Sequence, residues 1–293
     1  MRYGFIRREV SLYPVTLLCQ VMEVSRSGYY QYCRAGLSKT SRLELTLITE
    51  VKALAAMSQN SYGSRQMSKN LQNKGYSVGR YKARSLMRKA NVQSKQRRCY
   101  RITTDSRHML PVASNILNRE FTVTIPNSAW VTDITYLRTL EGWVYVAAVL
   151  DLFSRRIVGW AIAKHMRETM VNDALQMALG RRQPAAGLLH HSDRGVQYAS
   201  NDYQASLKAV GITVSMSRKG NCWDNAVMER FWGSLKSERT NGKIYRTREA
   251  AKADVIDYIE MFYNSKRLHS TLGYLSPLQF ENQFLFNKVS VFT

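Results

Sequence analysis

Apolar residues within positions 1–107 recur three or four residues apart, which predicts short amphipathic helices. Ser41 and Glu44 form a capping box ahead of one helix, and Ser64 and Ser77 are placed to cap two more. Gly75 ends the second of these helices. Their buried faces are expected to carry Leu47, Ile48, Val51, Leu54, Ala55, Met67, Leu71, Ala83, Leu86, Met87 and Ala90. The pattern predicts a small all-α domain, helix-turn-helix-like over about 40–92, with another helical turn unit at 15–30.

From Phe121 onward the pattern changes to short runs rich in Val, Ile, Trp and Tyr, which are typical of strands. The expected strands are residues 130–137, 142–150, 156–163, 188–192 and 212–216. Helices are expected at 166–179 and 202–210 between strands, and at 224–238 and 247–263 after them. Trp130, Trp143 and Trp160 are expected in the core. This order predicts an α/β fold in which helices flank one sheet of five strands.

The charge balance adds a partner to this picture. The chain has 43 Lys and Arg against 21 Asp and Glu, a formal net charge of +22, which points to nucleic acid. Its four cysteines are scattered, without a zinc-site or disulfide spacing, so we expect reduced thiols and a cytoplasmic protein. No apolar run is long enough to span a bilayer and no signal peptide is evident, so no membrane partner is expected.

Basic residues gather on one face of the third predicted helix, at Arg80, Arg84 and Arg88. A helical hairpin with a solvated basic face would show the same pattern. The global charge favours the alternative, in which these side chains contact double-stranded DNA. A basic linker is expected at 95–101, between the helical region and the sheet.

Three carboxylates stand out against this basic background. Asp133 lies in an apolar strand-like run, Asp193 ends another, and Glu229 lies in a helical stretch. Residues 194–228, 35 in all, separate the last two acids. Strand-end carboxylates with a helix Glu reaching across can hold two cations, which activate the attacking oxygen and stabilise the leaving oxygen in displacement at phosphorus. These three side chains are the predicted metal ligands and catalytic groups.

The local sequences around the acids resemble the DDE transposases of the retroviral-integrase superfamily, and within it the second-frame (orfB-type) catalytic subunit of the bacterial insertion-sequence-three family. The matching segments are WVTDITY at 130–136, HSDRGVQY at 191–198, DNAVME at 224–229, YNSKRLHS at 263–270, GYLSP at 273–277, SYGSR at 61–65 and LMR at 86–88. The resemblance covers nearly the whole chain. It implies a helical DNA-binding region at 1–110 and, at 120–285, a ribonuclease H-like catalytic core with a mixed five-stranded sheet.

The same resemblance implies an activity and its requirements. The enzyme would cleave DNA strands at the ends of an insertion element and join them to new DNA, using Mg²⁺ or Mn²⁺, as two ions. It would act as a homo-oligomer on DNA with a first-frame (orfA-type) partner, or as a fused product; the chain, without long heptads, has the features of the second-frame part alone. The alternatives are a non-catalytic DNA-binding regulator and a ribonuclease H-like nuclease.

Other polar residues lie near Asp133, Asp193 and Glu229 in the sequence or on the same predicted elements. Arg218 and Lys219 lie in a predicted basic loop, and Asn225 and Lys236 fall on the helical face of Glu229; all four are expected to contact DNA, as are Arg267 and His269. Lys236 could instead be solvated, and Arg267 and His269 could be structural. His190 and His191 beside Asp193 are expected to pack or form hydrogen bonds rather than bind metal. Asp151 is expected in a turn and Asp224 as a helix N-cap.

Overall fold

The computed structural model describes residues 2–34, 39–95, 110–219 and 221–289. Its first helices are α1 (Arg2–Glu9), α2 (Val15–Val21) and α3 (Arg26–Arg34), which bury a small cluster of their own. Ile6, Leu18, Cys19 and Tyr29 form that cluster. The helical turn unit expected at 15–30 is therefore present as α2 and α3, whereas α1 was not anticipated.

The second helical unit consists of α4 (Lys39–Met57), α5 (Ser64–Asn73) and α6 (Arg80–Lys89). Its apolar faces are buried as the spacing predicted. The predicted caps were wrong, because Ser41 and Ser64 already lie within helices and Ser77 precedes α6 by several residues. Gly63 and Gly79, both extended, occupy the N-cap positions and offer no side-chain hydrogen bond. Gly75 adopts a φ of +87°, as the turn after α5 requires.

The five strands form one mixed sheet in the order β3-β2-β1-β4-β5. Strands β1 (Ala129–Thr139), β2 (Gly142–Asp151) and β3 (Ile157–Ala163) form an antiparallel meander. β4 (Leu189–Ser192) and β5 (Thr213–Met216) run parallel to β1. The prediction of a mixed five-stranded sheet with flanking helices is confirmed, and every strand begins and ends within two residues of its expected bounds.

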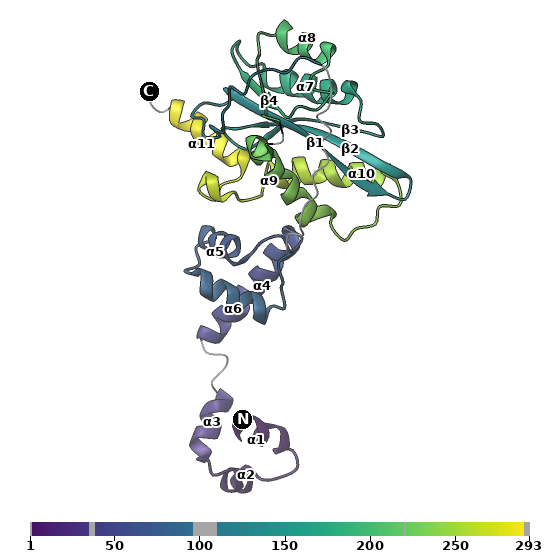
Figure 1. Cartoon of the computed structure of the whole chain (residues 1–293). Coiled ribbons are helices and arrows are strands. Elements are labelled where there is room, and N and C mark those ends of the chain that lie inside the picture. Colours follow the sequence, from purple (N-terminus) through teal and green to yellow (C-terminus); the bar gives the residue numbers. More distant parts are fainter. Residues whose placement is uncertain (1, 35–38, 96–109, 220, 290–293) are drawn as a thin grey trace.

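Helices cover both faces of the sheet (Figure 1). α7 (Glu168–Arg182) and α8 (Asn201–Ala209) pack on one face. The approach of α7 is so close that a Cβ on Gly159 would lie 2.2 Å from the carbonyl oxygen of Ala174, so that strand position requires glycine. The other face carries α9 (Ala226–Leu235) and α10 (Arg248–Asp257), extended by the π-helical segments η2 (Lys236–Thr240) and η3 (Tyr258–Tyr263). A last helix, α11 (Pro277–Val289), was not predicted.

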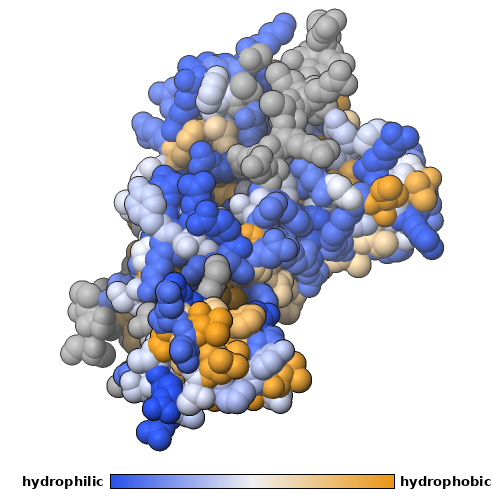
Figure 2. All heavy atoms as spheres, turned by 90° about the horizontal axis from the view of Figure 1, so that it is seen from below, coloured by the Kyte–Doolittle hydropathy of each residue, from blue (hydrophilic) through white to orange (hydrophobic). Residues whose placement is uncertain are grey.

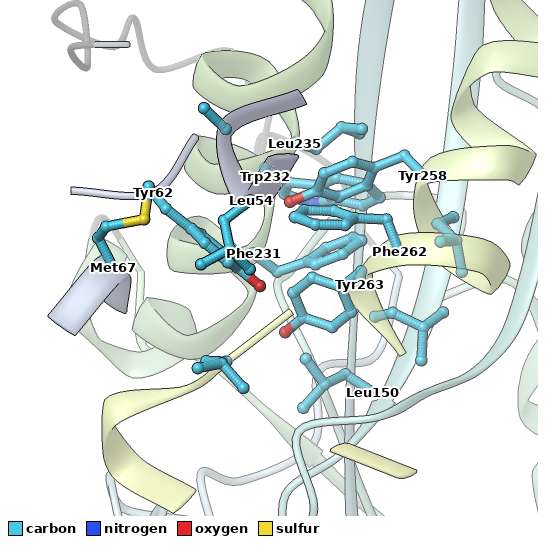
Figure 3. Close-up of a cluster of buried hydrophobic side chains, with 14 of the residues drawn as sticks. Leu54, Tyr62, Met67, Leu150, Phe231, Trp232, Leu235, Tyr258, Phe262 and Tyr263 are labelled. Carbon is cyan, nitrogen blue, oxygen red and sulfur yellow. The ribbon is translucent and has the colours of Figure 1, made fainter. Parts of the chain in front are cut away.

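The second helical unit shares its hydrophobic core with the sheet domain. Leu54, Tyr62 and Met67 belong to the same buried cluster as Phe231 of α9 and Phe262 of η3 (Figure 3). Three polar contacts reinforce this contact: the Tyr62 hydroxyl donates to the Lys266 carbonyl (3.1 Å), Gln66 Nε2 to the Leu268 carbonyl (3.0 Å) and Lys95 Nζ to the Glu238 carbonyl (2.8 Å). The shared hydrophobic cluster and these contacts pack α4–α6 against the sheet domain.

Viewed from below, hydrophilic residues cover most of the visible face, with compact hydrophobic patches between them (Figure 2). Within the described ranges, none of the helices has the length and apolar character needed to cross a bilayer. Apart from Lys95, the predicted basic linker lies outside the described residues.

Candidate active site

Sheet register brings Asp133 and Asp193 together. β1 and β4 run parallel, and Val131 pairs with His191. Each aspartate lies two residues beyond its member of that pair, so both carboxylates leave the sheet at the same edge and on neighbouring strands. They line one cavity of about 410 Å³.

Both carboxylates have specific hydrogen-bond partners. Trp232 of α9 donates its indole N–H to Asp133 Oδ2 (3.1 Å), and the Gly195 backbone N–H donates to Asp193 Oδ1 (2.8 Å). A Cβ on Gly195 would lie 3.0 Å from that same oxygen, so glycine allows the tight turn after the strand. Burial, followed by the neighbouring charge of Asp193, raises the pKa of Asp133 well above its ordinary value.

Glu229 reaches the same region from the first turn of α9. It lies three residues before Trp232, which contacts Asp133, so both side chains occupy one helical face. Its charge also raises the pKa of Asp133, although less than burial and Asp193 do. Glu229 remains exposed and lies outside the residues that line the cavity of the two aspartates. Partial desolvation raises its own pKa.

The donor set suits a hard divalent cation. In the described part of the chain, no three His, Cys, Asp or Glu side chains are gathered closely enough to form a metal site. Asp133 and Asp193 nevertheless present oxygen ligands into one cavity, and a bound cation would offset the repulsion between their like charges, which adds to burial in raising the pKa of Asp133. The fit is therefore to a cation whose coordination is completed by other ligands.

α9 is fixed against the sheet at its start. Asn225, the residue preceding it, donates from Nδ2 to the Thr132 carbonyl (3.0 Å), next to Asp133. Its side chain is buried, so the structure gives Asn225 a bracing role, and a DNA contact by this residue stays an untested prediction. Lys236, at the other end of the helix, lies over the Tyr136 ring with Nζ 5.4 Å from the centroid. Burial lowers its pKa, which the nearby Asp133 charge partly counters.

The predicted basic loop at 217–221 is anchored by a buried acid. Arg218 donates to both carboxylate oxygens of Asp224 (2.9 and 2.8 Å), and Arg119 and Asn115 donate to the same group (2.8 and 2.9 Å). The Arg218 hydrogen bonds lower the pKa of Asp224. The prediction of Asp224 as an N-cap was wrong: it lies in the short 3-10 turn η1 (Cys222–Asn225), where Asn221 is the cap. Lys219 is exposed beside this anchor.

Arg267 and His269 are integrated into the fold. Arg267 donates to both oxygens of Glu238 (2.7 to 3.0 Å), and His269 lies edge-on to the Tyr263 ring, 4.9 Å between centroids. Both also line a cavity of about 680 Å³ at the junction with the second helical unit. The other cationic residues of that cavity are Arg65, Lys95, Arg155 and Arg230. Bracing is therefore observed for both residues, and a DNA contact stays a prediction.

The two histidines beside Asp193 form hydrogen bonds within the protein, although the buried Nδ1 of His190 has no partner among the described residues. His190 Nε2 lies 3.1 Å from the Tyr203 hydroxyl, and His191 lies between the hydroxyls of Ser215 (2.9 Å) and Ser217 (3.1 Å). Burial lowers the pKa of His190 to about 3 and that of His191 to about 4, so both are neutral at pH 7. Hydrogen bonding and packing, as expected, account for them.

Several features of the site were missed or misread from the sequence. Trp232 was not singled out, although its spacing of three from Glu229 on one helical face was a usable signal. Trp143 was expected in the core, but its exposed fraction is 45% and it lines the aspartate cavity, because β1 has no partner at that edge for most of its length. Asp151 was expected in a turn; it is the fully buried last residue of β2. Arg80, Arg84 and Arg88 are exposed along α6, as predicted.

Comparison with known proteins places these features in context. Models of the integrase core domain match residues 123–222 and 229–285, and a model of an HTH-like domain matches residues 42–100. The chain is 40% identical over 287 residues to the transposase InsF for insertion sequence IS3A of Escherichia coli (strain K12), covering 97% of this chain and 100% of that protein. It is 42% identical over 267 residues to an uncharacterized 31 kDa protein of insertion element IS600 from Shigella sonnei, covering 91% and 98%.

Solved structures offer a more distant likeness. A chain of the simian T-cell lymphotropic virus intasome, solved in complex with the PP2A regulatory subunit B56 gamma, aligns with a TM-score of 0.43 at 15% identity. The alignment covers 78% of this chain and 73% of that one.

Proposed function

This chain belongs to the transposase family of the IS3 insertion sequences, and on that premise we propose that Asp133, Asp193 and Glu229 carry its DNA cleavage and strand transfer. The observation that carries the proposal is the shared cavity of two carboxylates, placed by neighbouring strands, with a third carboxylate on the adjoining helix. In a strongly basic DDE-type polynucleotidyl transferase, acids gathered at one point are suited to metal-assisted displacement at phosphorus.

The reaction needs two displacements, each of which makes and breaks one phosphorus–oxygen bond. In the first, a water oxygen attacks a phosphodiester at an element end, and the 3′ oxygen leaves with a proton as a free hydroxyl. In the second, that hydroxyl attacks another phosphodiester, losing its proton, and the 3′ oxygen of the attacked strand leaves. No oxidant or reductant is required, so the protein's task is positioning and charge neutralisation.

Individual side chains would perform that positioning. Asp133 and Asp193 would hold the cations, and Glu229 would complete one coordination shell from the helix. Trp232 keeps one Asp133 oxygen occupied and thereby orients the other. Two Mg²⁺ or Mn²⁺ ions, when bound, would supply Lewis acidity for the attacking and leaving oxygens. Lys236, which lies near Asp133, would meet a phosphate oxygen next to the reacting group.

The remaining basic residues would hold the DNA. Arg80, Arg84 and Arg88 project from one exposed helix, and Lys219 projects from the loop beside the site. We propose that these residues contact phosphates of bacterial DNA in the cytoplasm, with oligomers of the chain on the element ends. We also propose a first-frame (orfA-type) partner, or a fused product, as the source of additional end recognition.

The triad prediction is tested with single alanine variants. Asp133→Ala, Asp193→Ala and Glu229→Ala should each lose Mg²⁺-dependent cleavage of a duplex carrying the element's end, because a ligand of the reacting cations is removed. DNA affinity should change little, because none of these three acidic side chains can form an ion pair with a DNA phosphate. Asp173→Ala, an exposed acid on α7, is the matched control and should cleave normally. Near-normal cleavage by any triad variant would remove that residue from the site.

Metal binding gives an independent readout. The protein alone should bind Mg²⁺ or Mn²⁺ weakly and bind it more tightly with element-end DNA, whose phosphate oxygens supply missing ligands. A calorimetric titration with and without DNA, on wild type and Asp133→Asn, measures this coupling. Tight binding without DNA, or binding indifferent to Asp133, would contradict a two-metal site at this position.

The alternative functions make different predictions for the same assays. A non-catalytic DNA-binding regulator would bind element ends and show no cleavage with any divalent metal. A ribonuclease H-like nuclease would cleave an RNA–DNA hybrid and would not join a 3′ end to a second duplex. Joined products from a labelled element end would favour the transposase over both.

A further inference from the structure

The aspartate cavity has an aromatic wall that the chemistry at phosphorus does not use. Beside Asp133 and Asp193 it is lined by Tyr136, Trp143 and Tyr145, with apolar neighbours. We refer to these three side chains as the aromatic shelf. The Tyr136 and Trp143 rings meet edge to face at 5.0 Å between centroids, and Tyr136 lies 6.4 Å from Tyr145. The shelf and the two carboxylates therefore belong to one hollow in the surface.

Strand pairing explains why the three rings gather there. Tyr136 of β1 and Tyr145 of β2 are direct cross-strand partners, and Trp143 lies two residues from Tyr145, so all three side chains project from the same face of the sheet. The β1–β2 hairpin runs beyond β4, which pairs with β1 only at residues 129–131. The shelf thus stands on the projecting part of the sheet, next to the strand position that carries Asp133.

Core packing accounts in part for Tyr145, which contacts the buried cluster beneath α7 and α8, but not for Trp143. The exposed fraction of Trp143 is 45%, and two apolar residues at the same cavity, Met166 and Val196, are 45% and 47% exposed. A large aromatic side chain at a wet cavity beside two acids loses favourable burial. Apolar area in this position is expected where a ligand covers it.

The rim of the shelf carries a cation. Lys236 Nζ lies 5.4 Å from the centre of the Tyr136 ring. Burial lowers the pKa of Lys236, and the nearby Asp133 charge partly counters this. A ligand that fits this wall must therefore combine a flat apolar face with a nearby anion. A nucleotide has both: a base that stacks on aromatic rings and a phosphate that a lysine can meet.

We propose that the aromatic shelf receives the base of the nucleotide next to the scissile phosphate, turned out of the duplex stack. This inference rests on the proposed function, because the proposed chemistry places that phosphate at Asp133 and Asp193. Inside a duplex, both faces of each base are covered by its neighbours, so the shelf can be filled only by a base that has left the stack. Stacking on the shelf then offsets the cost of unstacking and selects the nucleotide at the cleavage position.

A thermodynamic cycle tests the contact directly. The dissociation constants of wild type and Trp143→Ala are measured by fluorescence anisotropy, without divalent metal, on an element-end duplex. They are measured again on duplexes in which one nucleotide flanking the cleaved phosphate is abasic. Trp143→Ala should weaken binding to the intact duplex by about tenfold, as the loss of one stacked base does. On the abasic duplex the two proteins should bind alike, because the base that Trp143 would contact is missing.

Matched controls separate stacking from folding and from general DNA affinity. Phe286→Ala removes an exposed aromatic side chain from α11 and should bind both duplexes as wild type does. Trp143→Phe, which keeps an aromatic face, should restore most of the affinity. An abasic nucleotide one helical turn into the duplex should leave the cost of Trp143→Ala unchanged. Thermal melting of each variant checks that the fold is intact.

Two outcomes would overturn the inference. The first is an equal cost of Trp143→Ala on intact and abasic duplexes, which would make Trp143 a structural residue. The second is a change in oligomeric state with Trp143→Ala, by light scattering, without any coupling to the base, which would assign the shelf to another copy of the chain. Mg²⁺-dependent cleavage by wild type is measured in parallel, so loss of the coupling with cleavage intact refutes the shelf alone, whereas loss of cleavage refutes the proposed function.

Discussion

Three buried aspartates in this protein differ in charge behaviour because their surroundings differ. Asp224 accepts hydrogen bonds from Arg218 and Arg119, and its pKa is lowered. Asp151 is buried with two backbone N–H donors at 3.0 and 3.1 Å and Arg182 Nη2 at 4.0 Å, and burial raises its pKa to about 6. Burial and then the like charge of Asp193 raise the pKa of Asp133 well above the ordinary value, although the hydrogen bond from the Trp232 indole lowers it.

Asp151 gives the protein a pH-dependent stability. Its native pKa of about 6 lies above the reference value of 3.8, so the native state binds more protons than the unfolded state between these values. Its contribution to the free energy of unfolding should therefore fall as pH rises through that window, by on the order of 3 kcal/mol. Asp151→Asn does not titrate, so its stability relative to wild type should improve between about pH 4 and about pH 7.

Urea unfolding midpoints at these two pH values measure the effect. The exposed control Asp202→Asn should follow the wild-type pH profile. Parallel profiles for wild type and Asp151→Asn would show that Asp151 titrates normally in the folded protein.

Sequence reasoning at this scale identified residues by their chemistry and missed their partners. The acids at 133, 193 and 229 were recognisable from spacing and local sequence. The roles of Trp232 and Arg119 depend on contacts with residues about a hundred positions away. Asp224 was predicted as a helix N-cap, but Arg218 and Arg119 donate to its carboxylate instead. Their charged hydrogen bonds are stronger than those from the backbone N–H groups of a helix start.

Among the secondary-structure elements, α9 organises the site. Its start is tied to β1 through Asn225, its first turn supplies Glu229, its middle supplies Trp232, and its continuation η2 supplies Lys236. Phe231, Trp232 and Leu235 pack the helix into the shared core (Figure 3). One helix therefore sets the position of the third acid relative to the other two.

A buried ion pair supports this helix from behind. Glu238 of η2 accepts from Arg267 through both oxygens and from the Tyr258 hydroxyl (2.7 Å). Arg267→Ala should destabilise the protein by about 3–5 kcal/mol, because it leaves a buried carboxylate without its partner. Arg267→Lys should recover only part of the loss, since lysine cannot bond both oxygens in the same geometry.

Chemical denaturation followed by tryptophan fluorescence measures both variants. The surface pair Lys74–Glu50 serves as the control, and Lys74→Ala should cost less than about 1 kcal/mol. A cost for Arg267→Ala no larger than that of Lys74→Ala would mean that solvent reaches Glu238 and that the pair does not support the helix.

At the scale of the whole molecule, the protein carries a large excess of positive charge. The exposed arginines of α6 form one row on the second helical unit, and the net charge of the chain is +22. DNA affinity should therefore fall steeply with salt, because each phosphate contact releases counterions.

Reversing Arg80, Arg84 and Arg88 to Glu should weaken DNA binding and reduce the slope of log affinity against log salt by about three. The comparison is a triple reversal at Lys52, Lys208 and Lys252, which lie on other helices. Titrations at several salt concentrations give both slopes. Equal losses in the two triple variants would mean that α6 presents only a solvated face.

The sheet and its flanking helices could be predicted because their signals are local: period-two runs for strands and period-three-to-four runs for helices. The docking of α4–α6 on the sheet domain could not, because Tyr62 and Gln66 reach carbonyls some two hundred residues away. The final helix α11 has too little contrast between its faces to be recognised from periodicity. Trp143 was misassigned because a strand that continues beyond its neighbour exposes residues that otherwise resemble core.

The docking of α4–α6 sets the spacing between the arginines of α6 and the acids of the sheet. The row of arginines on α6 and the acids of the sheet are held by one continuous core, so the distance and the rotational angle between them are fixed. Duplex DNA turns once in about 10 base pairs, so if α6 and the acids contact one duplex as proposed, the phosphate presented to the acids would be determined by where α6 sits along the helix. Moving a binding site by about five base pairs would turn the cleavable bond to the far side of the duplex. The cleaved phosphodiester would then lie at a set distance from the DNA segment that α6 binds.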